Sequence, residues 1–141
     1  MTPNAPEPLR VESIRVRADR IEIQVGVQSE RHAYTDAALM KRVLKDHPSL
    51  ALHACRNHKG ALFSDVMNNT AVPHLLEHMV VDGQTRAARD EQRIFTGTTQ
   101  WDAHDLLKAH VAVSYEDDLV ALRVLSECVS YLNEILSELR G

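Results

Sequence analysis

Two histidines and a glutamate in the run Val72–Val80 are the residues of this chain best suited to chemistry. In a helix, His74 and His78 lie one turn apart on one face, with Glu77 beside them. Two imidazoles on one helix can hold a zinc ion, and a neighbouring carboxylate can take a proton from the water that the ion activates. The order H-x-x-E-H is the inverted form of the zinc-peptidase motif. It predicts Zn²⁺ as cofactor, the histidines as ligands and Glu77 as general base.

A structural role for the two histidines is the competing interpretation. Histidines at positions i and i+4 of a helix can be half-buried residues that donate hydrogen bonds to backbone carbonyls. That interpretation leaves Glu77 unexplained, so the sequence favours the metal site.

Hydrophobic periodicity indicates the strands that must support this helix. Apolar and polar residues alternate over Val11–Val16 and Ile21–Val27, as in a half-buried antiparallel pair. Later strands are expected at Ile94–Thr99, where Gly97 would allow a close approach, and at Ala109–Tyr115. Leu50–Cys55 is either a strand or an irregular return.

Helices are expected between these strands. Thr35 is predicted to cap a first helix that His47-Pro48 stops, and a brief helix is expected within Leu62–Met67. The motif helix begins near Val72 and ends within residues 83–90. The clearest helix runs from Leu119 to Leu139. This order predicts an α+β fold: a single domain over residues 9–141, with a mainly antiparallel sheet and helices packed on one face, after a flexible lead-in at residues 1–8.

Composition excludes several classes of partner. Net charge is −4, with 16 basic and 20 acidic residues spread along the chain, so no nucleic-acid partner is expected. No apolar run reaches the roughly 18 residues of a membrane span. The start, Met1–Pro6, lacks the apolar core of a signal peptide, and a cytoplasmic protein is expected. The oligomeric state, including a homo-oligomer, is left open.

The two cysteines are isolated in the sequence. Cys55 and Cys128 form no C-x-x-C pair, which fits a reducing compartment and small buried apolar residues. No chemical role is expected for either.

The chain resembles the N-terminal domain of cyanophycin synthetases over roughly Leu50 to Leu132. The matching residues are His53-Ala54-Cys55, Gly60, Phe63, Thr70, His74-Leu75-Leu76-Glu77-His78, Gln84 and Val111-Ala112-Val113-Ser114-Tyr115-Glu116-Asp117-Asp118. In that family the domain precedes two ligase domains, and in some members it carries a metal-dependent peptidase activity that cuts the arginine-aspartate polymer. The resemblance implies a peptide or amide substrate.

The string Pro73–Met79 is also similar to the zinc helix of pitrilysin/insulinase-type peptidases, in which the two histidines bind zinc and the glutamate is the base. Those enzymes take a third ligand, a glutamate, from a later helix. The candidates in this chain are Asp118, or Glu116, in the acidic cluster that the cyanophycin-type domain also has. A solvated first turn of the last helix is the alternative for these acids.

One departure from the cyanophycin-type pattern bears on the substrate. Phe95–Trp101 lacks two arginines that the family has there, which predicts a changed anionic specificity. Thr98 and Trp101 are expected to form part of the substrate wall. The sequence therefore predicts a zinc-dependent amide or peptide hydrolase acting on cyanophycin-like or isopeptide-containing peptides. The alternative is a non-catalytic domain that docks onto a separately encoded ligase of cyanophycin-synthetase or Mur type.

Overall fold

The computed structural model describes residues 6–141, so most of the predicted lead-in, residues 1–5, lies outside the described part of the chain. The strands and helices are β1 (Leu9–Val16), β2 (Arg20–Val27), α1 (Ala37–Asp46), α2 (Val72–Ala87), β3 (Gly97–Trp101), β4 (Lys108–Ser114) and α3 (Asp118–Arg140). Short 3-10 segments lie at Glu30–His32, Pro48–Leu52 and Phe63–Asp65.

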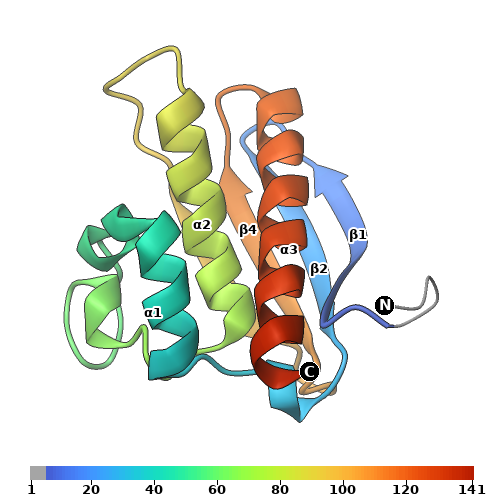
Figure 1. The fold of residues 1–141 in the computed structure, drawn as a ribbon. Coiled ribbons are helices and arrows are strands. Elements are labelled where there is room, and N and C mark those ends of the chain that lie inside the picture. Colours follow the sequence, from blue (N-terminus) through green and yellow to red (C-terminus); the bar gives the residue numbers. More distant parts are fainter. Residues whose placement is uncertain (1–5) are drawn as a thin grey trace.

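The four strands form one antiparallel sheet in the order β1-β2-β4-β3. Alternation along β2 buries Ile21, Ile23 and Val25 and turns Glu22 and Gln24 to the other face. Helices α2 and α3 lie side by side over the buried face, and α1 packs beside them (Figure 1). The predicted α+β domain with helices on one face of an antiparallel sheet is confirmed.

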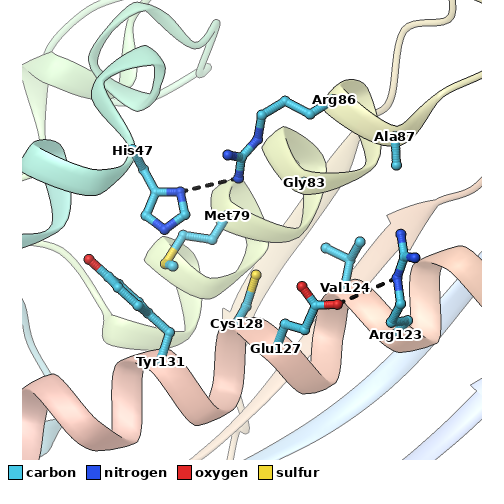
Figure 2. A pocket seen from close by; sticks show the side chains of 10 residues that line it. All are labelled: His47, Met79, Gly83, Arg86, Ala87, Arg123, Val124, Glu127, Cys128 and Tyr131. Atoms are coloured by element: carbon cyan, nitrogen blue, oxygen red, sulfur yellow. Dashed lines mark hydrogen bonds and ion pairs between the residues drawn. The ribbon is translucent and has the colours of Figure 1, made fainter.

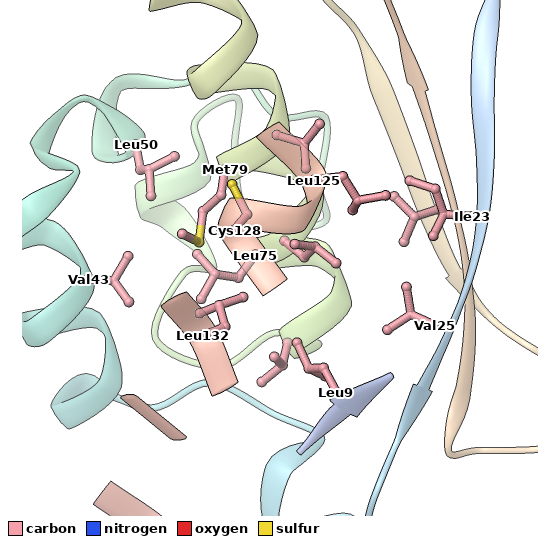
Figure 3. Packing of buried hydrophobic residues seen from close by; sticks show 14 of the residues in the cluster. Leu9, Ile23, Val25, Val43, Leu50, Leu75, Met79, Leu125, Cys128 and Leu132 are labelled. Atoms are coloured by element: carbon pink, nitrogen blue, oxygen red, sulfur yellow. The ribbon is translucent and has the colours of Figure 1, made fainter. Parts of the chain in front are cut away.

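The core lies between the sheet and the three helices. Leucine, valine and methionine side chains from α1, α2 and α3 form one cluster with the apolar face of β2, and Val43 of α1 lies on the far side of the cluster from Ile23 and Val25 (Figure 3). Among the labelled residues, Leu75 and Met79 come from α2, Leu125 and Leu132 from α3, and Ile23 from β2. This packing fixes how α2 faces the strands, and therefore where its motif points. None of the helices within residues 6–141 is long and apolar enough to cross a membrane.

Helices α2 and α3 run in opposite directions (Figure 1). They approach closely at Gly83, where a Cβ atom would lie only 2.5 Å from Cγ1 of Val124. The lack of a side chain at Gly83 therefore allows the packing, and α2 continues through this glycine to Ala87. Because the two helices are antiparallel, the start of α3 lies beside the end of α2.

Several local expectations need correction. The side chain that caps α1 belongs to Asp36, which accepts from Leu39 N at 2.8 Å, because Thr35 Oγ1 instead accepts from Thr70 N. For Leu50–Cys55, by contrast, one of the two predicted alternatives is confirmed: the segment is an irregular return, with a 3-10 segment and an isolated bridge. The brief helix within Leu62–Met67 is only a 3-10 turn, and the strand expected from Ile94 begins at Gly97.

The N-terminus of α3 supplies a stability prediction. Asp117 caps the helix by accepting from the amides of Leu119 (2.9 Å) and Val120 (3.4 Å). Replacing Asp117 with alanine is expected to lower the free energy of unfolding by about 1 kcal/mol, because two helix donors lose their partner. Urea denaturation followed by circular dichroism measures it. Asp118→Ala, next to the cap, is the control, and equal losses in both variants would contradict the assignment.

Candidate metal centre

The first two turns of α2 place the predicted histidines together. Pro73 occupies the first turn, where its missing N–H costs no helical hydrogen bond. His74 Nε2 and His78 Nε2 lie 3.2 Å apart. His78 and Glu77 are buried, whereas His74 is half-buried, so the pair lies at the edge of the core. The predicted shared helix face is confirmed.

A third metal-ligating side chain reaches this pair from the loop before α2. Cys55 Sγ lies 3.6 Å from His74 Nε2. The loop doubles back on itself through a bridge between Ala54 and Leu62 and a hydrogen bond from Cys55 N to Ala61 O, so that the thiol faces α2. Cys55, His74 and His78 each offer one donor atom, and these atoms lie within 4.8 Å of one another.

The two cysteines therefore differ. The expectation that Cys55 is only a small apolar residue needs correction, because the loop brings its thiol to the histidines. Cys128 is buried in the core, and burial raises the pKa of its thiol to about 12. A thiol held neutral in this way is unreactive.

Two of the three donor separations match the edges of a tetrahedral zinc site, and all three lie within 4.8 Å. Zn–N bonds of about 2.0 Å and Zn–S bonds of about 2.3 Å give tetrahedral edges of about 3.3 Å between two nitrogens and about 3.5 Å between nitrogen and sulfur. The corresponding separations are 3.2 Å between the two Nε2 atoms and 3.6 Å between His74 Nε2 and Cys55 Sγ. This donor set can hold a metal ion, and a fourth coordination position would remain for a water molecule or a substrate.

The remaining ring nitrogens already have partners. His74 Nδ1 lies 2.9 Å from Thr70 Oγ1, and His78 Nδ1 lies 3.1 Å from His53 Nδ1. The buried ring of Phe63 stacks on His78 with 4.2 Å between centroids and meets His74 edge-on at 5.2 Å. Both imidazoles are thus held with Nε2 toward the thiol side of the cluster.

Glu77 lies next to this cluster and is held from the sheet. Its Oε1 accepts a hydrogen bond from Thr99 Oγ1 at 2.8 Å, and its Oε2 lies 3.8 Å from His78 Nε2. A Cβ atom on Gly97 would lie 2.7 Å from Cγ of Glu77, so the bare glycine makes room for the carboxylate. The group that comes close to Gly97 is thus the Glu77 side chain, rather than the ligand or backbone that the sequence predicts there.

Burial controls the protonation of these groups. It raises the pKa of Glu77 to about 7, although the hydrogen bond from Thr99 and the nearby His53 oppose the rise. Burial, with smaller effects from His74 and His53, lowers the pKa of His78 to about 3, and burial also lowers the pKa of His74. Both histidines are therefore neutral near pH 7, as metal ligands must be.

The acidic candidates for a third ligand are not part of this cluster. Within residues 6–141 the donor group contains neither Asp118 nor Glu116. Glu116 is exposed and accepts from the amides of Arg89 and Asp90, beyond the end of α2. Asp118 begins α3 at the same end, and from His78 to that end α2 rises about 14 Å. The antiparallel packing of α2 and α3 explains why the expectation fails.

Thr98 and Trp101 lie on opposite faces of β3. Alternation exposes the Thr98 side chain on the face away from the helices, so Thr99 is the threonine that reaches Glu77. Trp101 is half-buried on the same face as Thr99, and its ring lies 5.8 Å from that of the exposed Tyr34. Of the two predicted wall residues, only Trp101 faces the side of the metal centre.

A cavity of about 420 Å³ lies elsewhere, between α2, α3 and the end of α1 (Figure 2). Met79, Gly83, Cys128 and Tyr131 line it, together with Arg86, which contacts His47 across its mouth. Cys55, His74 and His78 do not line this cavity, so it is distinct from the candidate metal centre.

Comparison with known proteins adds no assignment. No family model matches the chain, and none of the curated proteins matches its sequence. The class of site described here therefore rests on the fold and on the Cys55, His74 and His78 geometry.

Proposed function

We propose that the protein is a zinc-dependent amide or peptide hydrolase. Cys55, His74 and His78 hold the ion, and Glu77 is the general base. The observation that supports this is the position of the Glu77 carboxylate. It is buried, its Oε2 lies 3.8 Å from His78 Nε2, and it is not one of the three donor groups. A structural zinc site with four protein ligands would need no such neighbour.

The chain's own residues would divide the chemistry as follows. When bound, a zinc ion acts as a Lewis acid and lowers the pKa of a water ligand. Glu77 would hold a proton on Oε2, which lies toward His78, because its Oε1 accepts the hydrogen bond from Thr99. Gly97 lets the strand lie against the Glu77 side chain, which is buried. Glu77 would thus be a general base set beside a metal ion.

The proposed substrate class rests on the sequence resemblance and on the aromatic residues near the site. The likeness to the cyanophycin-synthetase N-terminal domain supports a peptide or isopeptide, and the missing arginines at Phe95–Trp101 argue for a substrate other than a strongly anionic one. Tyr34 and Trp101 would form an aromatic wall near the start of α2, since Tyr34 pairs with Ala71 in an isolated bridge.

The test of this function starts with protein purified without added metal or an affinity tag. We expect about one zinc per chain, and metal-dependent cleavage of at least one class in a mass-spectrometric screen of acidic, basic and mixed peptides, including isopeptides. A chelator should abolish cleavage and zinc should restore it. Zinc without cleavage of any class would favour the docking domain for a separately encoded ligase, and no metal at all would contradict both the centre and the hydrolase.

A further inference from the structure

A chain of polar contacts extends from the metal centre into the body of the protein. His78 Nδ1 lies 3.1 Å from His53 Nδ1, and His53 Nε2 lies 3.5 Å from Asp82 Oδ1. Asp82 is one helical turn after His78 on α2, so the first and last residues in this series of contacts share one face of the helix. The proposed hydrolase function assigns neither His53 nor Asp82 a role.

Asp82 is a buried carboxylate that its surroundings keep ionised. Its side chain is only 6% exposed. Ser49 Oγ donates to Oδ1 at 2.6 Å, and Arg86 Nη2 lies 3.2 Å from Oδ2 as an ion pair without hydrogen-bond geometry. Although burial opposes ionisation, contacts with His47, His53, Ser49 and Arg86 hold the pKa of Asp82 well below its usual range. Asp82 therefore acts only as an acceptor.

The ionised carboxylate of Asp82, an ion-pair contact 3.5 Å from His53 Nε2, favours the proton of the His53 imidazole on that nitrogen. In its neutral form an imidazole carries one proton, so a His53 with that proton on Nε2, beside Asp82, presents an unprotonated Nδ1. That nitrogen accepts from His78 Nδ1–H, and His78 Nε2 is left with its lone pair toward Cys55 and His74. The stacked ring of Phe63 opposes a flip of the His78 imidazole that would exchange its two nitrogens.

We propose that His53 and Asp82 are positioning residues that hold His78 in the Nδ1–H tautomer, so that its Nε2 is ready to bind the metal. This role rests on the proposed metal centre. It resembles the general arrangement in which a carboxylate orients a metal-binding histidine, here with a second histidine between them. His74 has a simpler partner in Thr70.

The tautomer can be measured without any metal. In ¹⁵N-labelled, metal-free protein, long-range ¹H–¹⁵N spectra distinguish Nδ1–H from Nε2–H, and a His78→Gln sample assigns the His78 signals. We expect Nδ1–H in the wild type. His53→Leu removes the acceptor and should shift His78 to Nε2–H, whereas His53→Gln keeps a side-chain carbonyl and should retain Nδ1–H. An Nε2–H wild type, or an unchanged tautomer in His53→Leu, would overturn the proposal.

Zinc affinity gives the second measurement, by competition with a chromogenic chelator. His53→Leu and Asp82→Asn should each weaken binding about 10- to 100-fold, the usual cost of losing an outer partner of a metal ligand. Asp102→Asn is the matched control, because it breaks a comparable carboxylate–histidine pair, Asp102 with His110 at 2.8 Å, in another part of the fold. Circular dichroism verifies folding, and His53→Gln provides a milder variant if Asp82→Asn unfolds.

The two measurements separate this role from the hydrolase. A wild type with the Nδ1–H tautomer but no zinc uptake would contradict the metal centre and support the tautomer assignment. Zinc affinity that is unchanged in His53→Leu would overturn the positioning role, even if the protein is a hydrolase.

Discussion

Replacing His78 with alanine is expected to abolish stoichiometric zinc binding. The change removes one of three donor atoms from a cluster in which all three lie within 4.8 Å of one another. Two remaining protein ligands are fewer than zinc sites in proteins normally use. Elemental analysis of protein purified without a metal-binding tag measures the effect, and circular dichroism should show largely intact helix, because alanine is a good helix former. Equal metal content in wild type and variant would contradict the centre.

The third ligand can be tested with matched variants of the same experiment. Cys55→Ala should weaken zinc binding by at least about tenfold. Losing a residue that only supports a ligand already costs about that much, and losing a ligand should cost no less. Cys128→Ala changes a cysteine in the core, and Asp118→Ala changes an acid at the other end of α2. Neither of these controls should alter zinc content. A loss of zinc in Asp118→Ala alone would restore the acidic residue as the ligand and contradict the role of Cys55.

The second large effect is expected for Glu77→Gln. Glu77 is not among the three donors, so the variant should keep its zinc, but glutamine cannot accept a proton as a base. The rate of peptide cleavage should fall by about 100-fold or more, the usual scale of a general base. Glutamine preserves size and can still accept the hydrogen bond from Thr99, so misfolding does not account for such a loss.

Two comparisons sharpen this result. Glu134→Gln makes the same chemical change at an exposed position on α3 and should leave the rate unaltered. Thr99→Val removes the hydroxyl that holds Glu77 Oε1 and should cause a smaller loss than Glu77→Gln, because the base remains but is held less firmly. Cleavage by Glu77→Gln at the wild-type rate would remove Glu77 from the mechanism.

Features that depend on residues close together in the chain could be predicted from the sequence. The spacing of His74 and His78 places both on one face of any helix, because the α-helix repeats every 3.6 residues. In the same way, two-residue alternation of apolar and polar residues located β2 and β4, and a long run of apolar residues at helical spacing located α3. These local periods also gave the α+β order of elements, from which the fold class follows.

The residues that lie beside the His74–His78 motif depend on packing, and two predictions about them are wrong. Asp118 was an attractive ligand, but α3 runs antiparallel to α2 and starts at its far end (Figure 1). Thr98 was expected beside the substrate, but the register of β3 on β4 turns Thr99 toward Glu77. A shift of one residue exchanges the two faces of a strand, and no local pattern in this short polar strand determines that choice.

Cys55 and His53 illustrate what only the tertiary structure decided. They lie two residues apart in an irregular segment, so an extended backbone can direct both side chains to the same neighbour. That spacing was the available clue, but it gave no indication of which element they would face. The bridge between Ala54 and Leu62 closes the loop against α2 and brings His53 to His78 and Cys55 to His74. The sequence by itself determined the helix face that carries the histidines. Long-range packing decided which thiol and which supporting side chains reach them, because contacts between distant segments leave no periodic pattern in the chain.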